Sequence, residues 1–404
     1  MDSLTQITLG AACGELVLGK KIGNRAMLWG AIGGTIPDLD VLANFMLTDI
    51  EALAFHRGIS HSLLFAVTTP FLFAWLTQRF YKNGVYQKTW YKGIAFSIWT
   101  LLLLGILLLV NYIPIIITEQ KSVIVGMISL PLFLLTVYKL WTNYLKTPLE
   151  PVTANYRDWV QLFFWSIFTH PLLDAFTAYG TQLFAPFSNY RVAFNSISVV
   201  DPIYTVPFII CLVIASYISR HKKNRRYMTY LGLALSSCYL LYTVFNKQRI
   251  DKIFAASLEE QNIEYQRFRT SPSIFNNILW QGVAEGKDVY YMGMYSLFDS
   301  SPRVQFYPLE KKHELIQDLE SEQDIKTLKW FSDGYYAIMP LADGKFQLSD
   351  VRYGSVNEQA TRPEDFVFRF IIDPKPDGIE VKEIRARDDV GGMFSTLITR
   401  IKGK

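Results

Sequence analysis

The stretch IPDLDVLANFMLTDIEALAFHRGISHS, residues 36–62, brings two aspartates, Asp38 and Asp40, near two histidines, His56 and His61. Carboxylate and imidazole groups are common protein ligands of divalent transition metals. Apolar sequence lies on both sides of the stretch, and ionisable groups in such surroundings are costly and point to a function. We therefore predict that the stretch forms part of a metal site.

A second, smaller cluster, THPLLD at residues 169–174, lies far downstream. Its His170 and Asp174 are four residues apart, so on a helix they share one face and can ligate the same ion. Pro171 lies between them and is expected to kink that helix. We predict that the two clusters meet in the folded protein.

Long uncharged runs indicate an integral membrane protein. Residues 93–118, 122–138, 202–219 and 227–246 contain no Asp, Glu, Lys or Arg. Each run is close to the roughly 20 residues that cross a bilayer as a helix. After residue 246, charged residues become frequent and Gly and Pro interrupt the pattern. The sequence thus predicts an all-α polytopic membrane bundle of about eight helices over residues 1–246, followed by a small α+β soluble domain over residues 247–404.

The boundaries of the expected elements follow from apolar runs and breaker residues. Membrane helices are expected at residues 3–19, 26–35, 63–78, 93–117, 123–138, 159–179, 203–219 and 227–246. The first is rich in small residues, which suits close helix packing in lipid. Ser60 is expected to cap the third helix. In the tail, a helix is expected at 247–262 and strands at 288–294, 334–339 and 366–372.

The distribution of basic residues predicts an orientation. With eight helices and the N-terminus outside, fifteen Lys and Arg residues fall in inside loops and three in outside loops, and this follows the positive-inside rule. The outside residues are Arg57, Lys121 and Arg191. Both clusters then lie at the outer face, and residues 247–404 are extracytoplasmic. The basic residues lie in short clusters between apolar runs, which is typical of topology signals, so no nucleic-acid partner is expected. The three cysteines show no disulfide or zinc-finger spacing.

The combined clusters predict hydrolytic metal chemistry. A mixed nitrogen and oxygen site suits zinc, manganese or iron, with one or two ions, and such an ion activates water and polarises a phosphoryl or acyl oxygen. His56 is either a ligand or a general acid–base, His61 belongs to the same machinery, and Arg57 is suited to holding a phosphate. No G-x-S-x-G elbow and no P-loop are present. Four further polar residues could belong to the site: Asp2, Gln6, Glu15 and Asp201.

Other interpretations of these residues remain open. His170 alone could serve as a hydrogen-bonding residue in helix packing, the PDLD segment as a helix-capping turn, and His56 with Arg57 as an interfacial anchor. At the level of function, the alternatives are a cation-coupled transporter and a non-catalytic membrane regulator or binding protein. The clusters lie at one end of the predicted bundle and do not cross it, which argues against a transporter. The sequence leaves the substrate and the oligomeric state open.

Several blocks of the chain resemble, in order, the YdjM-type membrane-bound, metal-dependent hydrolases. These blocks are MDSLTQITLGAA, GAIGGTIPDLD, HRGISHSLLF, THPLLDAFTAYGTQL and DPIYTVP. The resemblance extends over residues 1–245, and the tail resembles a C-terminal extension found in some members. It implies a multi-pass protein of the bacterial cytoplasmic (inner) membrane that contacts membrane lipids.

The resemblance also implies a ligand set and a substrate class. The metal ligands of the family map onto Asp38, Asp40, His56, His61, His170 and Asp174. Its distant relatives are the all-helical zinc phospholipases C and P1-type nucleases, so a lipid or other phosphoester substrate and zinc are expected. Many members have Thr-His where this chain has Thr5-Gln6. Since glutamine is a poor metal ligand, one metal position is expected to be altered here.

Overall fold

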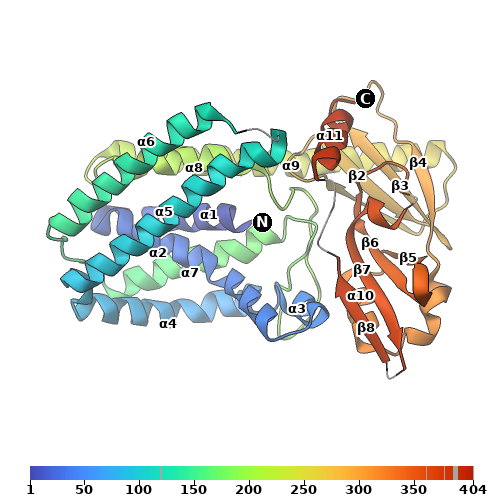
Figure 1. The fold of residues 1–404 in the computed structure, drawn as a ribbon, viewed down its shortest axis with the longest axis horizontal. Helices are drawn as coiled ribbons and strands as arrows, with labels where there is room; N and C mark the ends of the chain where they lie inside the picture. The colour runs from blue at the N-terminus through green and yellow to red at the C-terminus, as the bar shows by residue number, and fades with distance from the viewer. Residues whose placement is uncertain (119–120, 361, 377, 385–389, 404) are drawn as a thin grey trace. The chain divides into compact units, whose positions relative to one another are not determined.

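The structure is a computed structural model that describes residues 1–404 except 119–120, 361, 377, 385–389 and 404. About 59% of the residues are helical. The described chain divides into two compact units, one formed by Met1–Pro70 with Gln161–Lys404 and the other by Phe71–Val160. Figure 1 shows the helices of both units and the C-terminal strands, which belong to the first unit.

The first unit begins with a tightly packed helix pair, α1 (Ser3–Ile22) and α2 (Asn24–Thr35). Glycines on both helices allow the backbones to touch: a Cβ atom added at Gly14 would lie 2.0 Å from the carbonyl oxygen of Ala26. Small residues permit such close approach between helices in a membrane. The small-residue packing expected of the first helix is therefore present, and it fixes where the chain leaves α2.

The N-terminal part of this unit contains further elements. They are the 3-10 helices η1 (Pro37–Phe45) and η2 (Ile59–His61), and the α-helices α3 (Asp49–Phe55), α7 (Tyr156–Asp174), α8 (Pro202–Tyr217) and α9 (Lys223–Glu260). Of these, α8 and α9 pack on α1. The α7 helix ends at Asp174, five residues before the predicted end at residue 179. The metal-ligand candidates on α7 therefore lie in its last turn, beside the loop that leads to α8.

Helix α9 is continuous through residue 246, where the sequence predicts a change of domain. The predicted membrane helix at 227–246 and the predicted tail helix at 247–262 form one element of 38 residues (Figure 1). No Gly or Pro interrupts the chain between Leu233 and Glu260, so nothing local ends the helix there. The helix thus leads directly from the apolar part of the chain to the C-terminal sheets.

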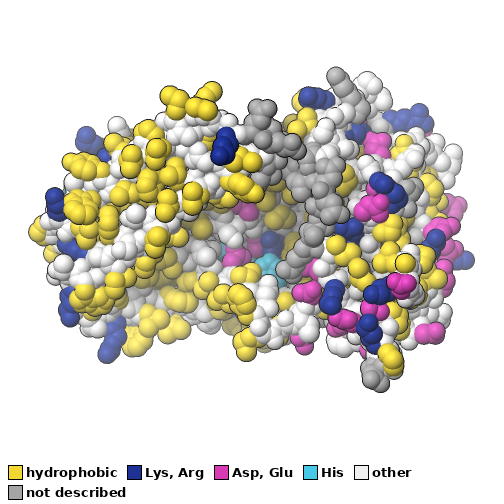
Figure 2. All heavy atoms as spheres, viewed as in Figure 1, with side chains coloured by type: hydrophobic (Ala, Val, Ile, Leu, Met, Phe, Trp, Pro, Cys, Tyr) yellow, Lys and Arg dark blue, Asp and Glu magenta, His cyan; other side chains and the backbone are white. Residues whose placement is uncertain are grey.

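The second unit consists mainly of apolar helices. They are the end of α4 (Leu63–Lys82), the 3-10 helix η3 (Val85–Gln87), α5 (Thr89–Thr118), α6 (Val123–Leu140), the π-helical turn η4 (Trp141–Lys146) and the start of α7. Helices α5 and α6 share a hydrogen bond in which the Asn111 amide donates to Ser129 Oγ at 2.9 Å. Their outer surfaces are largely hydrophobic (Figure 2), as expected for helices in contact with lipid.

Four described helices are long and apolar enough to cross a membrane. They cover Leu63–Lys82, Thr89–Tyr112, Val123–Lys146 and Lys223–Glu260, and Pro202–Tyr217 is a shorter apolar helix. Helix α2 falls outside this group because it has only 12 residues. Helices α1 and α7 are long enough, but they contain many polar and charged residues. The number of membrane spans therefore stays a prediction.

The C-terminal part contains two four-stranded antiparallel sheets with consecutive strand order. The first holds β1 (Arg267–Pro272), β2 (Leu279–Glu285), β3 (Val289–Ser296) and β4 (Phe306–Glu310), and the second holds β5 (Tyr336–Pro340), β6 (Phe346–Ser355), β7 (Phe366–Lys375) and β8 (Gly378–Glu383). The helices here are η5 (His313–Leu319), α10 (Gln323–Phe331), η6 (Ala342–Gly344), η7 (Pro363–Asp365) and α11 (Val390–Ile401).

The predicted α+β class of the tail is confirmed, and its core is aromatic. The three strands expected at 288–294, 334–339 and 366–372 correspond to β3, β5 and β7. Trp280, Tyr290, Phe366 and Phe370 are fully buried in or between the sheets. The short aromatic runs thus identified three of the eight described strands, and β1, β2, β4, β6 and β8 were not predicted.

Candidate metal centre

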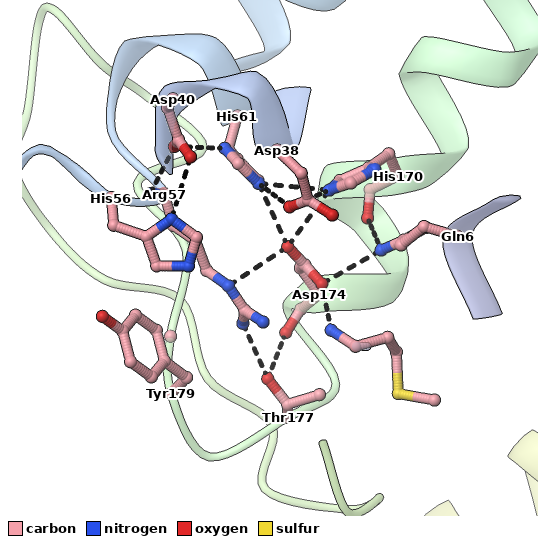
Figure 3. A network of polar contacts seen from close by, with 12 residues as sticks. Gln6, Asp38, Asp40, His56, Arg57, His61, His170, Asp174, Thr177 and Tyr179 are labelled. Atoms are coloured by element: carbon pink, nitrogen blue, oxygen red, sulfur yellow. Dashed lines mark hydrogen bonds and ion pairs between the residues drawn. The ribbon is translucent and has the colours of Figure 1, made fainter. Parts of the chain in front are cut away.

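Three side chains from separate segments converge on one point (Figure 3). His61 Nε2 lies 3.1 Å from His170 Nε2, and Asp38 Oδ1 lies 3.4 Å from the first nitrogen and 3.3 Å from the second. A tetrahedral metal ion that binds nitrogen and oxygen at about 2.0–2.1 Å holds its ligand atoms about 3.3–3.4 Å apart. The spacing of the three atoms therefore fits one face of a metal coordination shell.

Asp174 supplies a fourth oxygen beside the two imidazoles. Its Oδ2 lies 3.4 Å from His61 Nε2 and 3.5 Å from His170 Nε2. The carboxylate is fully buried, and Oδ2 has no hydrogen-bond partner among the described residues. The other oxygen, Oδ1, accepts from the Gln6 amide at 3.0 Å and contacts the amino group of Met1. A buried carboxylate oxygen without a donor is costly, and a cation at the cluster would satisfy it.

The tautomers of the two histidines direct lone pairs toward the same point. His170 Nδ1 lies 2.6 Å from the carbonyl oxygen of Gly34, which can only accept, so Nδ1 carries the proton and the Nε2 of the neutral ring carries a lone pair. His61 Nδ1 likewise lies 3.0 Å from Ser60 Oγ and 3.3 Å from Asp40 Oδ2. Two acceptor nitrogens beside two carboxylate oxygens repel one another unless a cation lies between them.

Asp40 holds the surroundings of the cluster in place and does not face the cluster's centre. Its Oδ2 accepts from Ser60 Oγ and from the backbone N–H of Arg57, each at 3.0 Å, and its Oδ1 lies 2.9 Å from His56 Nδ1. Burial alone would raise the pKa of Asp40, but the contacts with His56 and His61 outweigh burial and lower that pKa. A carboxylate behind a metal-binding imidazole orients the ring and increases its basicity.

The two aspartates of the PDLD segment contact opposite sides of one histidine. Asp38 lies at the Nε2 side of His61 and Asp40 at the Nδ1 side. In an extended turn the two carboxylates, two residues apart, would point the same way. Pro37 begins a 3-10 helix instead. With about three residues per turn, residues two apart point in different directions, so Asp38 faces the cluster and Asp40 supports His61 from the other side.

His56 lies at the edge of the cluster. It follows α3, whose start carries a capping box formed by Thr48 and Glu51. The sequence analysis missed this short helix, although the pattern T-x-x-E is the signal for it. The His56 ring is 5.8 Å from that of His61, and 27% of its side chain is exposed. His56 therefore lies outside the group of converging ligand atoms, with Asp40 between it and His61.

Arg57 is buried against Asp174. Its Nε lies 3.3 Å from Asp174 Oδ2, its NH1 group donates to Thr177 Oγ1 at 3.0 Å, and its guanidinium lies over the ring of Tyr179. Only 4% of its side chain is exposed. The sequence analysis assigned Arg57 to a phosphate ligand, whereas the structure places its charge against a candidate metal ligand.

The four additional polar candidates occupy different positions. Gln6 touches the cluster through its amide nitrogen, which donates to Asp174 Oδ1 and to the carbonyl of His170. Asp2 caps α1 through the backbone N–H of Thr5, and Asp201 caps α8 and accepts from the hydroxyl of Tyr239. Glu15 forms a buried ion pair with Arg225. Of these four, only Gln6 borders the site.

Ser60, Gly34 and Thr177 support the cluster and were missed from the sequence. Ser60 was expected to cap the helix after it, but Ser62 performs this role by accepting from the backbone N–H of Phe65. Ser60 links Asp40 to His61 instead. The Gly34 carbonyl is in the last turn of α2, where carbonyls lack partners within the helix. No local pattern assigns such carbonyls, since their partner is distant in sequence.

The family comparison identifies the N-terminal part of the chain. Residues 1–112 and 123–250 match the family described as YdjM inner membrane protein. The chain belongs to this family. The match ends within α9 and includes every residue of the cluster, so the converging ligand atoms belong to the part of the chain that the family defines.

Membership, together with the apolar helices, makes the chain an inner membrane protein. No curated protein and no solved structure was found to match the chain. The resemblance to the YdjM-type proteins expected from the sequence is thus confirmed as family membership.

Proposed function

We propose that this YdjM-family protein is a metal-dependent hydrolase that cleaves a phosphoester or lipid substrate at the outer face of the inner membrane. The observation that carries the proposal is the convergence of Asp38 Oδ1, His61 Nε2 and His170 Nε2 within 3.1–3.4 Å of one another. Asp174 Oδ2, which lacks a hydrogen-bond donor, lies beside them. A set of two imidazoles and two carboxylates suits zinc, with manganese and iron as alternatives.

The residues around the cluster have distinct roles in this proposal. When bound, the ion supplies an activated water and polarises the ester oxygen. His61 and His170 hold the ion through Nε2, because Asp40 with Ser60 and the Gly34 carbonyl engage their Nδ1 atoms. Arg57 lies beside Asp174 Oδ2, with its Nε at 3.3 Å, and its positive charge limits the repulsion between the buried carboxylates.

His56 is the residue best placed to move a proton. Asp40 engages its Nδ1 at 2.9 Å, which leaves Nε2 to exchange a proton with substrate or water. The ring also lines a cavity of about 270 Å³ together with Asn44, Leu53 and Tyr179. The adjacent segment exposes Phe45 and Met46, at 88% and 89%. Apolar side chains exposed beside a reactive centre suit a substrate that approaches from lipid.

Hydrolysis by purified protein tests the proposal. The full chain in detergent is expected to cleave a chromogenic phosphodiester or vesicles of anionic phospholipid, to stop when a chelator removes the metal, and to recover on addition of zinc. His56→Gln is expected to lose most turnover while it keeps its metal, since the side chain lies outside the ligand group. An absence of turnover across a broad ester panel with full metal loading would favour the regulator. Cation-coupled flux in proteoliposomes would favour the transporter.

The orientation part of the proposal has its own test. Single cysteines at exposed positions Ser301, Lys82 and Lys223 are introduced into a chain without its three native cysteines. In intact cells, an impermeant thiol reagent is expected to label only Ser301→Cys, because the basic loops stay in the cytoplasm. Labelling of Lys82→Cys and Lys223→Cys with protection of Ser301→Cys would invert the orientation and place the metal centre at the cytoplasmic face.

A further inference from the structure

A cavity of about 440 Å³ lies at the loop between α7 and α8, against the C-terminal sheets. Four arginines line it: Arg191 from the loop, Arg267 and Arg269 from β1, and Arg352 from β6. Three of the four guanidiniums lie over aromatic rings that also line the cavity: Arg191 over Trp330 and Phe331, Arg352 over Phe331, and Arg267 over Tyr335. We call this cavity the arginine pocket. Its volume is within the range of small-molecule sites.

Two of the four arginines are paired with carboxylates. Arg352 binds Asp350 through two nitrogens, with an NH2–Oδ2 distance of 2.6 Å. Arg267 Nε donates to Glu285 at 2.6 Å. The charges of these two residues are therefore compensated within the protein, and they contribute mainly shape and hydrogen-bond donors to the pocket.

Arg191 contacts no carboxylate among the described residues. Its Nε and NH2 groups donate to the carbonyl of Tyr179, at 3.3 and 2.9 Å, and NH2 also to that of Gly180. Its NH1 group is buried and has no partner among the described residues. Burial lowers the pKa of Arg191 to about 10, as expected for a guanidinium whose charge lacks a close counter-ion.

Arg269 likewise has no close carboxylate among the described residues. Its NH2 group donates to Asn195 Oδ1 at 2.5 Å, its buried Nε has no partner in the described chain, and its nearest carboxylate contact is with Asp333 at 3.9 Å. Asp333 itself is 63% exposed and is shared with Arg267. Burial and the neighbouring Arg352 lower the pKa of Arg269 to about 10. Arg191 and Arg269 are thus two buried cations that line one cavity and have no close carboxylate among the described residues.

We infer that the arginine pocket binds a phosphate group carried by a small molecule or by a lipid head group. Guanidinium groups match the oxygens of a phosphate, and the rings of Trp330 and Phe331 hold Arg191 in place before binding. A phosphate can carry two negative charges, and so can act as the counter-ion of both Arg191 and Arg269. This site is separate from the metal centre, because none of the converging residues Asp38, His61, His170 and Asp174 lines the cavity.

Binding to the full chain in detergent tests the inference, with glycerol 3-phosphate and a short-chain phosphatidic acid as the two probes. A chelator is present throughout, so that the metal centre does not contribute. Saturable calorimetric binding of glycerol 3-phosphate would show that the phosphate group suffices, and binding of the phosphatidic acid alone would assign the site to a lipid head group. Absence of saturable binding of either probe would overturn the inference.

The decisive variant is Asn195→Asp. It keeps the shape of Asn195 and gives Arg269 the carboxylate that it lacks, so it is expected to preserve folding and weaken probe binding about tenfold or more. Arg269→Gln should weaken binding similarly and serves as a second variant if Asn195→Asp does not fold. The control is Arg303→Gln, which changes an exposed arginine paired with Glu260 and should bind as the wild type does. Wild-type affinity in both pocket variants would disprove the assignment.

Discussion

His170→Ala is expected to lower the affinity for zinc by more than about a hundredfold, because changes to supporting residues alone cost about 10–100-fold. His170 contributes Nε2, which lies 3.1–3.5 Å from three other candidate ligand atoms. The side chain is fully buried, so water cannot readily replace it. Elemental analysis of purified protein and a competition titration against a zinc chelator measure the loss.

The same titration separates ligands from supporting residues. Asp40→Asn should weaken zinc binding by about 10–100-fold and less than His170→Ala, since Asp40 acts through His61 and His56. His221→Ala is the matched control, because this histidine is exposed in the basic loop before α9. Wild-type zinc content in His170→Ala, with His61→Ala equally unaffected, would show that the cluster does not hold the metal.

Arg225→Ala is expected to destabilise the protein by about 3–5 kcal/mol, because it leaves a buried carboxylate without its partner. Arg225 donates to Glu15 through Nε at 2.6 Å and through NH2 at 2.5 Å, and each side chain is only 4% exposed. Its NH1 group also donates to Asn24 and to the carbonyl of Ile218. One guanidinium therefore joins α1, the start of α2, the end of α8 and α9.

Unfolding by denaturant in detergent measures this effect. The control is Arg303→Ala: its partner Glu260 is 54% exposed, and an exposed pair contributes about 0.2–1 kcal/mol. The double substitution Glu15→Leu with Arg225→Met should recover part of the loss, because apolar residues can replace a buried pair. Equal destabilisation by Arg225→Ala and Arg303→Ala would show that the Glu15–Arg225 pair does not stabilise the bundle.

The metal-site candidates show where sequence reasoning succeeds. His170 and Asp174 are four residues apart in a helical run, and the helical period places both on one face. The structure brings them to the same point as His61 and Asp38. Carboxylate and imidazole side chains within uncharged sequence usually bind one another or an ion. The occurrence of two such clusters in one chain therefore predicted that they meet in the folded protein.

The roles of the residues that support the cluster could not be predicted from the sequence. Asp38 and Asp40 differ in role only because Pro37 starts a 3-10 helix, whose turn sends two neighbouring carboxylates to opposite sides of His61. Whether such a segment is extended or helical depends on packing against other elements as well as on the residues themselves. The capping pattern at Thr48 was readable in the sequence, whereas the roles of Ser60 and Gly34 depend on where His61 and His170 arrive.

The sequence by itself determined the membrane-type helices, the aromatic strands of the tail and the chemical types gathered for a metal site. These follow from composition and from the periods of helix and strand, which are local. Only the tertiary structure decided which carboxylate faces the histidine cluster, that Arg57 lies against Asp174, and that Glu15 pairs with an arginine 210 residues away. Such choices depend on distances of a few ångströms between segments remote in sequence, and helix packing through glycines such as Gly14 sets those distances.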